Sequence, residues 1–347
     1  MLSRVAESVY WMSRYLERAE NVARFVDVNY NLTLGDSAPL ADQWAPLIFT
    51  TADQADFIRR YDSTSRENAL QFLLFDADNP NSILSCISKA RESARTVREV
   101  IPTSVWEHLN RFKMLVENAA KTREAFDQPY DFCNSVKKTN QLLAGIANSS
   151  MSRDEAWLFA QMGRHIERAD KTSRIVDVQY FLLLPKVQDV GTAIDINRWS
   201  SLLKSADALD MYRRTHGRIL PNTVARFLIL DPLFPRSIRF CVEEAALRLS
   251  EVKQQNQHQV LPSDVLMDQL RKRLSSITIE EIIEQGMHGF IDQLQGALNG
   301  LGNAIYADFF DTSNQRKKIM ARQRSSRSQS RSRSPSQVID SMMQRQS

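Results

Sequence analysis

The charged residues best suited to chemistry occur as two sets, one near the start of the chain and one near its middle. Within each set, carboxylates and arginines stand three or four residues apart, the spacing that brings side chains together on one helix face. Such carboxylates can act as general acids or bases, and such arginines can bind an anion or a peptide carboxylate. The two sets are Arg14, Glu17, Arg18, Glu20, Arg24 and Asp27, and then Arg164, Glu167, Arg168, Asp170, Arg174 and Asp177.

The same pattern is also typical of ion pairs on a solvated helix face, each worth only about 0.3–0.5 kcal/mol. Two apolar residues count against a freely solvated face. Phe25 and Val28 lie inside the charged arc, and Ile175 and Val178 hold the same places in the second set. We therefore expect part of the arc to be covered, with its charges paired between the two copies or lining a cleft. A central ion network and a binding site for an anion or peptide both remain open.

Other catalytic and cofactor motifs are absent from the sequence. There is no phosphate-binding G-x-x-x-x-G-K-[ST] loop, no H-E-x-x-H pair and no G-x-S-x-G elbow. Glu17 and Glu20 stand three apart, but no histidine has the spacing of a di-metal bundle site, so we expect no metal and no other cofactor. His165 matches Tyr15 of the first set, which favours packing or a hydrogen bond over metal ligation.

The three cysteines are too few for a disulfide framework, which favours a reducing compartment. Cys86 and Cys241 hold equivalent positions and are either a nucleophilic or redox pair or, as we favour, buried small hydrophobes. The sequence shows no secretory signal and no apolar run of membrane-spanning length, so we expect a cytoplasmic protein.

The two charged sets belong to a longer internal repeat. Shifting residues 12–32 by 150 gives 11 identities in 21 positions, and a shift of 155 pairs Trp44 with Trp199 and Cys86 with Cys241. We call positions paired by these shifts matched positions. The repeat predicts an all-α, internally duplicated helical bundle with pseudo-two-fold symmetry, whose halves are residues 1–149 and 150–312 of one compact body.

Hydrophobic spacing predicts the helices that must position the charges. We expect one long helix over 4–32 and a second opening near 155 behind a Ser152 or Asp154 cap. Gly296 and Gly300 stand four apart and predict a close helix–helix approach. Further helices are predicted over 64–75, 82–98, from 105, from 263, and within 278–309.

The net charge of +4 hides an uneven distribution. Residues 316–347 carry nine Arg or Lys and one acid, whereas the preceding 315 residues carry 36 basic and 40 acidic residues. The segment 313–347 is rich in Ser and Arg and predicts a disordered basic tail. Such a tail is either solubilising or a weak electrostatic contact to nucleic acid, the one route by which we expect nucleic-acid binding.

Several segments resemble the bacterial alpha-E family, an all-helical domain with a Glu-Arg motif. Residues 10–21 (YWMSRYLERAEN) resemble its signature and residues 163–170 (GRHIERAD) its second motif. Residues 72–83, 91–95 and 230–237 are similar to further family segments, so the resemblance covers about 1–310. It implies an association with circularly permuted ATP-grasp proteins, which join carboxylates to amines, and with transglutaminase-like proteins.

The sequence together with this resemblance predicts an accessory or scaffold protein of an ATP-grasp peptide or amide ligase system, which binds a peptide or carboxylate at the duplicated charged centre. It is not expected to be an enzyme itself and not expected to contact a membrane. One rival is an enzyme that uses Glu17 and Glu167 as acid and base. Another is a nucleic-acid adaptor acting through the tail.

Overall fold

The computed structural model describes residues 2–33, 44–45, 47–48, 54–183, 193–256 and 260–311, and every regular element in these ranges is helical. The predicted all-α class is therefore confirmed. The predicted disordered tail, 313–347, lies outside the described residues. None of the helices that the structure describes is both long enough and apolar enough to cross a membrane.

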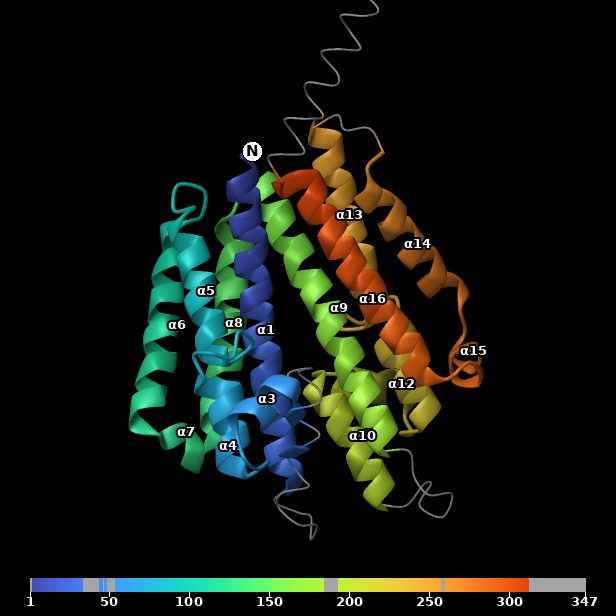
Figure 1. The fold of residues 1–347 in the computed structure, drawn as a ribbon. Coiled ribbons are helices and arrows are strands. Elements are labelled where there is room, and N and C mark those ends of the chain that lie inside the picture. Colours follow the sequence, from blue (N-terminus) through green and yellow to red (C-terminus); the bar gives the residue numbers. More distant parts are fainter. Residues whose placement is uncertain are drawn as a thin grey trace, which may run out of the picture.

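Two long helices run side by side through the centre of the molecule (Figure 1). They are α1 (Ser3–Thr33) and α9 (Glu155–Leu183), as predicted. Asp154 opens α9, because its carboxylate accepts the backbone N–H groups of Ala156 at 3.0 Å and Trp157 at 3.3 Å. Ala19 on α1 and Ala169 on α9 are fully buried, so small side chains stand at matched places on the two helices.

Each long helix is flanked by its own group of helices (Figure 1). Helix α1 packs against α5 and α8, and α6 packs against both of these; α9 packs against α13 and α16, and α14 packs against both of those. Both groups bury a stripe of apolar side chains, which is what holds the long helices in place. The flanking helices are α5 (Ile83–Arg95), α6 (Thr103–Thr122), α8 (Pro129–Ser150), α13 (Ile238–Asn256), α14 (Pro262–Ser276) and α16 (Met287–Ile305).

Short helices connect and close these groups. Two of them are π-helices, and η1 ends where the backbone N–H of Asp76 donates to the carbonyl of Gln71 at 2.8 Å. The short helices are α3 (Gln54–Arg60), α4 (Arg66–Leu70), η1 (Gln71–Phe75), α7 (Glu124–Asp127), α10 (Ala193–Ser205), α11 (Leu209–His216), α12 (Pro221–Leu230), α15 (Ile279–Glu284) and η2 (Tyr306–Phe310).

The predicted helices exist, with shifted ends. The segment predicted over 82–98 ends as a helix at Arg95, because the N–H of Thr96 turns back to the carbonyl of Ser93 at 3.2 Å. Helix α6 begins at Thr103, two residues earlier than predicted, directly after Pro102. The segment 64–75 is divided between α4 and η1.

Two similar turns precede α5 and α13. The carboxylate of Asp76 accepts two backbone N–H groups of the first turn, and that of Asp231 does the same in the second. Ser82 and Ser237 then cap the two helices, each accepting a backbone N–H at 3.1 Å. These turns hold positions 81 and 236 beside the long helices.

The close helix approach occurs at a different glycine from the predicted ones. A Cβ placed on Gly163 of α9 would lie 2.5 Å from the carbonyl oxygen of Tyr10 on α1, whereas one placed on Gly296 or Gly300 would meet nothing within 4 Å. The prediction for Gly296 and Gly300 was therefore wrong, because their face of α16 is not packed against another helix there. Close packing of the two long helices depends on Gly163 instead.

We expect Gly163→Ala to lower the free energy of unfolding by about 1–3 kcal/mol, because the added methyl group must push α1 away from α9. Gly296→Ala is the matched control, since it should raise stability by roughly 0.5–1 kcal/mol through helix propensity alone. Urea unfolding followed by circular dichroism measures both. Equal effects of the two substitutions would contradict the close approach.

Candidate functional site

The central charges form reciprocal ion pairs between α1 and α9. Arg18 on α1 donates from Nε to Glu167 Oε1 at 2.6 Å and from Nη2 to Oε2 at 3.1 Å. Arg168 on α9 donates from Nε and Nη2 to the two carboxylate oxygens of Glu17, both at 2.8 Å. The two Glu-Arg dipeptides are therefore joined by two bidentate ion pairs, in which the arginine of each dipeptide binds the glutamate of the other.

Both central carboxylates are buried: Glu17 is 1% exposed and Glu167 is fully enclosed. Burial by itself would raise the pKa of Glu17, but the positive charges of Arg168 and Arg236 outweigh it and hold this pKa well below its usual range. Burial is likewise outweighed at Glu167, whose pKa the charge of Arg18 lowers far below the ordinary value. Both groups are ionised at neutral pH.

Glu167 receives two further cations. Arg14 on α1 donates from Nε to its Oε2 at 2.8 Å, and the Lys171 ammonium, one helix turn along α9, lies 3.6 Å from Oε1. Arg14 is also enclosed by aromatic rings, because its guanidinium lies 4.9 Å from the centre of the Trp11 ring and its Nη1 donates to the Tyr10 hydroxyl.

Glu17 receives its second cation from a different place. Arg236, in the turn before α13, donates to Glu17 Oε1 at 3.1 Å and also contacts Glu20. Asn21, at the position matched to Lys171, donates to Glu17 Oε1 at 3.0 Å. Asn81, at the position matched to Arg236, accepts from Arg18 Nη1 at 2.7 Å. The two halves have thus exchanged a cation and an amide: positions 21 and 236 are Asn and Arg around Glu17, whereas the matched positions 171 and 81 are Lys and Asn around the Arg18–Glu167 pair.

Because of this exchange, we expect the effect of Asn21→Lys on the free energy of unfolding to change sign when Arg236 is also replaced. Asn21→Lys alone should lower the free energy of unfolding, because it adds a buried cation beside Arg236, whereas in an Arg236→Asn background it should restore part of the stability that Arg236→Asn removes. We expect the coupling between the two substitutions to lie in the range of about 1–3 kcal/mol. A double-mutant cycle in urea measures it, and additive effects would show that the two positions do not share Glu17.

The outer charges of the two sets are also paired. Arg24 donates from Nη2 to Glu20 Oε1 at 2.6 Å, and Arg174 donates from Nε to Asp170 Oδ2 at 3.0 Å. Asp27 pairs with Lys137 on α8, and Asp177 pairs with His288 on α16 at 2.7 Å. Of the predicted residues, Arg164 is the exception: within the described ranges, its hydrogen bonding consists of one long contact, from Nη1 to Gln161 Oε1 at 3.4 Å.

Sequence reasoning missed several members of this network. Lys171 stands four residues after Glu167, a spacing that could have been recognised. Arg236, Asn81, Lys137 and His288 come from turns and distant helices, and no local spacing pointed to them. The expectation of a covered arc is confirmed at Phe25 and Ile175, which are buried, whereas Val28 is only half-buried. The side chain of Val178 lies outside the described part.

The centre is poorly suited to acid–base catalysis. A carboxyl whose pKa lies far below neutrality holds no proton to donate, and its conjugate base is weak. In the part of the chain that the structure describes, no three His, Cys, Asp or Glu side chains group as metal ligands. What the arrangement does supply is a strong, directional connection between the two long helices.

The cysteines are buried hydrophobes within this frame. Cys86 and Cys241 are fully buried, and their thiols face the carbonyls of Pro80 at 3.7 Å and Pro235 at 3.5 Å. Burial raises the pKa of Cys86 to about 11 and that of Cys241 to about 12, so neither thiol is an activated nucleophile at neutral pH.

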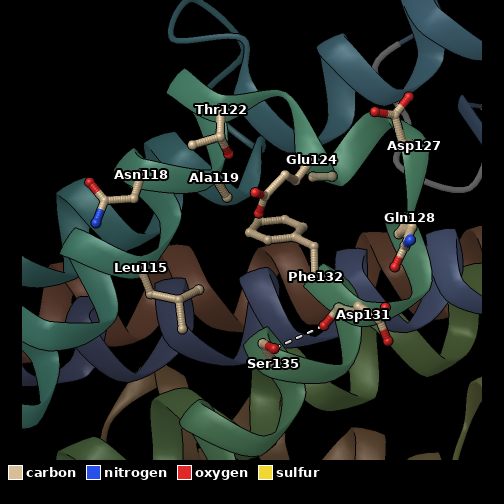
Figure 2. Close-up of a pocket in the computed structure, with 11 residues that line it drawn as sticks. Leu115, Asn118, Ala119, Thr122, Glu124, Asp127, Gln128, Asp131, Phe132 and Ser135 are labelled. Atoms are coloured by element: carbon tan, nitrogen blue, oxygen red, sulfur yellow. Dashed lines mark hydrogen bonds between the residues drawn. The ribbon is translucent and has the colours of Figure 1, made fainter.

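An open hollow of about 670 Å³ lies elsewhere, where α6, α7 and α8 meet (Figure 2). Its walls carry the carboxylates of Glu124, Asp127 and Asp131, and the Phe132 ring lies between them. None of the duplicated charges lines it. Sequence reasoning did not predict this hollow, because its residues have no recognisable motif spacing.

Comparison with known proteins gives a family without an assigned activity. Residues 1–310 match the Alpha-E family, described as "a predicted alpha-helical domain with a conserved ER motif". Uncharacterised proteins of Mycobacterium bovis and of two Mycobacterium tuberculosis strains are 23% identical over 321 residues, a match that covers 86% of this chain and 35% of each relative. The chain thus spans about a third of the length of these curated relatives. No solved structure matches it.

The Glu-Arg dipeptides that grip each other between α1 and α9 lie within the matched residues, and the match covers nearly all of the described helices. The chain therefore belongs to the Alpha-E family.

Proposed function

We propose that this protein is a non-catalytic accessory or scaffold of an ATP-grasp peptide or amide ligase system, with a transglutaminase-like protein as a further partner. One observation supports the non-catalytic part. The two carboxylates that an enzyme would use, Glu17 and Glu167, are buried and each is held by arginines of the opposite long helix. These two carboxylates are thus engaged in connecting the long helices and are not exposed as an acid or a base.

We further propose that the two halves, about 1–149 and 150–312, are copies of one ancestral unit related by a pseudo-two-fold axis. Three pairs of matched contacts support this. Arg18 and Arg168 make reciprocal ion pairs, Asp76 and Asp231 organise similar turns, and Asp27 and Asp177 each pair with a basic group of a later helix. A duplicated helical frame whose central carboxylates are buried and paired is well suited to holding partners.

The partner assignment rests on the family resemblance and on chain length. The mycobacterial relatives continue far beyond the matched region, since the match covers 35% of each. A domain that recurs inside longer chains is suited to acting beside other domains. An ATP-grasp ligase is the partner class that we propose, and a peptide or carboxylate ligand at the charged centre is part of this proposal.

Purification of the tagged full-length chain from its own cells at moderate salt tests the proposal. The expected result is stoichiometric co-elution of an ATP-grasp protein, identified by mass spectrometry, whose ATP-dependent amide formation increases when this chain is added. A chain lacking residues 316–347 serves as the matched control for contacts made through the basic tail. Amide turnover by the isolated chain that is lost in a folded Glu17→Gln variant would instead identify an enzyme.

A further inference from the structure

The second charged set contains an arginine whose bonding capacity is largely unused. Arg14 and Arg164 hold matched positions, yet Arg14 donates to Glu167 and to the Tyr10 hydroxyl and stacks beside Trp11. A guanidinium carries five N–H donors, and those of Arg164 reach one acceptor among the described residues, the Gln161 amide oxygen at 3.4 Å.

The cause lies in two sets of sequence differences between the halves. Trp11 and Tyr10, which cover Arg14, are matched by Gln161 and an alanine, so the aromatic enclosure is missing around Arg164. In addition, Glu17 already accepts from Arg168 on both oxygens and from Arg236 on Oε1, so its charge is shared by two arginines.

The carboxylates nearest Arg164 are already engaged. Glu17 is held by Arg168 and Arg236, and Glu20 is held by Arg24 and Arg236. Burial lowers the pKa of Arg164, and the neighbouring charge of Arg168 lowers it further, which is the direction expected for a cation without sufficient counter-charge.

Two further residues of α9 have polar atoms with few partners among the described residues. Arg168 uses Nε and Nη2 on Glu17, but its Nη1 reaches only the carbonyl of Pro235 at 3.4 Å among the described residues. His165 is nine-tenths buried, and its Nδ1 has no hydrogen-bond partner in the described structure. Arg164 stands four residues before Arg168 and His165 stands three residues before it, so each of the two neighbours Arg168 on the surface of α9.

We propose that Arg164, the free edge of Arg168 and His165 Nδ1 form an oxyanion-binding site, and that its ligand is a carboxylate or phosphate group of a small molecule or peptide. This inference rests on the proposed function in one respect, since a substrate carboxylate is what a ligase system would present. It adds that only the second of the two copies binds, because the corresponding place in the first copy is filled by Glu167, Tyr10 and Trp11.

Titration of the full-length protein with L-glutamate and with inorganic phosphate, in chloride-free buffer, tests this site. The wild-type protein should gain thermal stability with increasing oxyanion, and Arg164→Gln should weaken the apparent affinity by about tenfold or more, as expected for loss of a charge-assisted contact. The oxyanion with the lower Kd identifies the ligand as a carboxylate or a phosphate.

Matched variants make the result specific. Arg14→Gln should destabilise the ligand-free protein and keep its oxyanion response, whereas Arg164→Gln should leave the ligand-free protein as stable as wild type or more stable. Arg59→Gln, at an exposed position, should change neither. An unchanged response in Arg164→Gln, or a loss of stability equal to that of Arg14→Gln, would overturn the site. The titration uses the isolated chain, so its result does not depend on whether a ligase co-elutes. A failure of the oxyanion site can therefore be distinguished from a failure of the proposed function.

Discussion

Glu17→Gln is expected to lower the free energy of unfolding by roughly 3–5 kcal/mol, because it leaves buried arginines without their counter-charge. The neutral amide would present an NH2 group to the donors of Arg168 and would remove the negative charge that Arg168 and Arg236 share. Glu167→Gln should cost a similar amount, since it exposes Arg14 and Arg18 to the same loss. Urea unfolding followed by far-ultraviolet circular dichroism measures both effects.

Glu92→Gln is the matched control for this prediction. Glu92 also accepts from two arginines, Arg91 at 2.7 Å and Arg95 at 2.8 Å, but it is half exposed. Solvent screens such pairs, so the substitution should change stability by less than about 0.5 kcal/mol. If Glu17→Gln were as harmless as Glu92→Gln, the central pairs would not hold the long helices together. A Glu17→Gln protein that keeps full stability but loses a measurable turnover would support the rival enzyme.

Stability is expected to fall steeply as the pH is lowered below about 6.5, and the cause is His165. Burial, together with the positive charges of Arg168 and Arg164, lowers the pKa of His165 to about 3. The unfolded chain titrates this group near pH 6.5, so between these two values the unfolded state binds a proton that the folded state does not. The contribution of His165 to the free energy of unfolding is therefore fully present above about pH 6.5. On acidification it is lost at up to roughly 1.4 kcal/mol per pH unit.

His165→Gln should flatten this dependence. Between about pH 6.5 and pH 5, where carboxyl groups of the unfolded chain remain ionised, the wild type should lose about 2 kcal/mol more than the variant. His288 contributes a pH dependence of the opposite sign, because its hydrogen bond to Asp177 raises its pKa. The stability that His288 contributes is therefore present at low pH and lost as the pH rises. His288→Gln therefore separates the two histidines. Parallel curves for wild type and His165→Gln would show that His165 takes up its proton equally well in the folded and the unfolded state.

The sequence by itself determined the helical class, the two long helices and the duplicated charges that these two helices carry. The reason is that these features depend on local spacing. A 3.6-residue period places Arg14, Glu17 and Arg18 on one side of a helix whatever surrounds it, and apolar residues repeated within that arc indicate that it is covered. The cap of α9 was narrowed to Ser152 or Asp154 because capping depends on neighbouring backbone N–H groups, and the structure shows Asp154 in that role. The matched positions also identified which residues to compare.

Only the tertiary structure decided which charges meet. Glu17 could equally have paired with Arg14 on its own helix, but the crossing of α1 and α9 gives it to Arg168 instead. The turn before α13 brings Arg236 to the same carboxylate from more than 200 residues away, and no local pattern records that distance. The close approach at Gly163 rather than Gly296 also depends on where two helices touch. Long-range pairing is set by packing of the whole body, so two arginines at matched positions have different surroundings. Arg14 donates to Glu167 and Tyr10, whereas Arg164 reaches one acceptor among the described residues, the amide oxygen of Gln161.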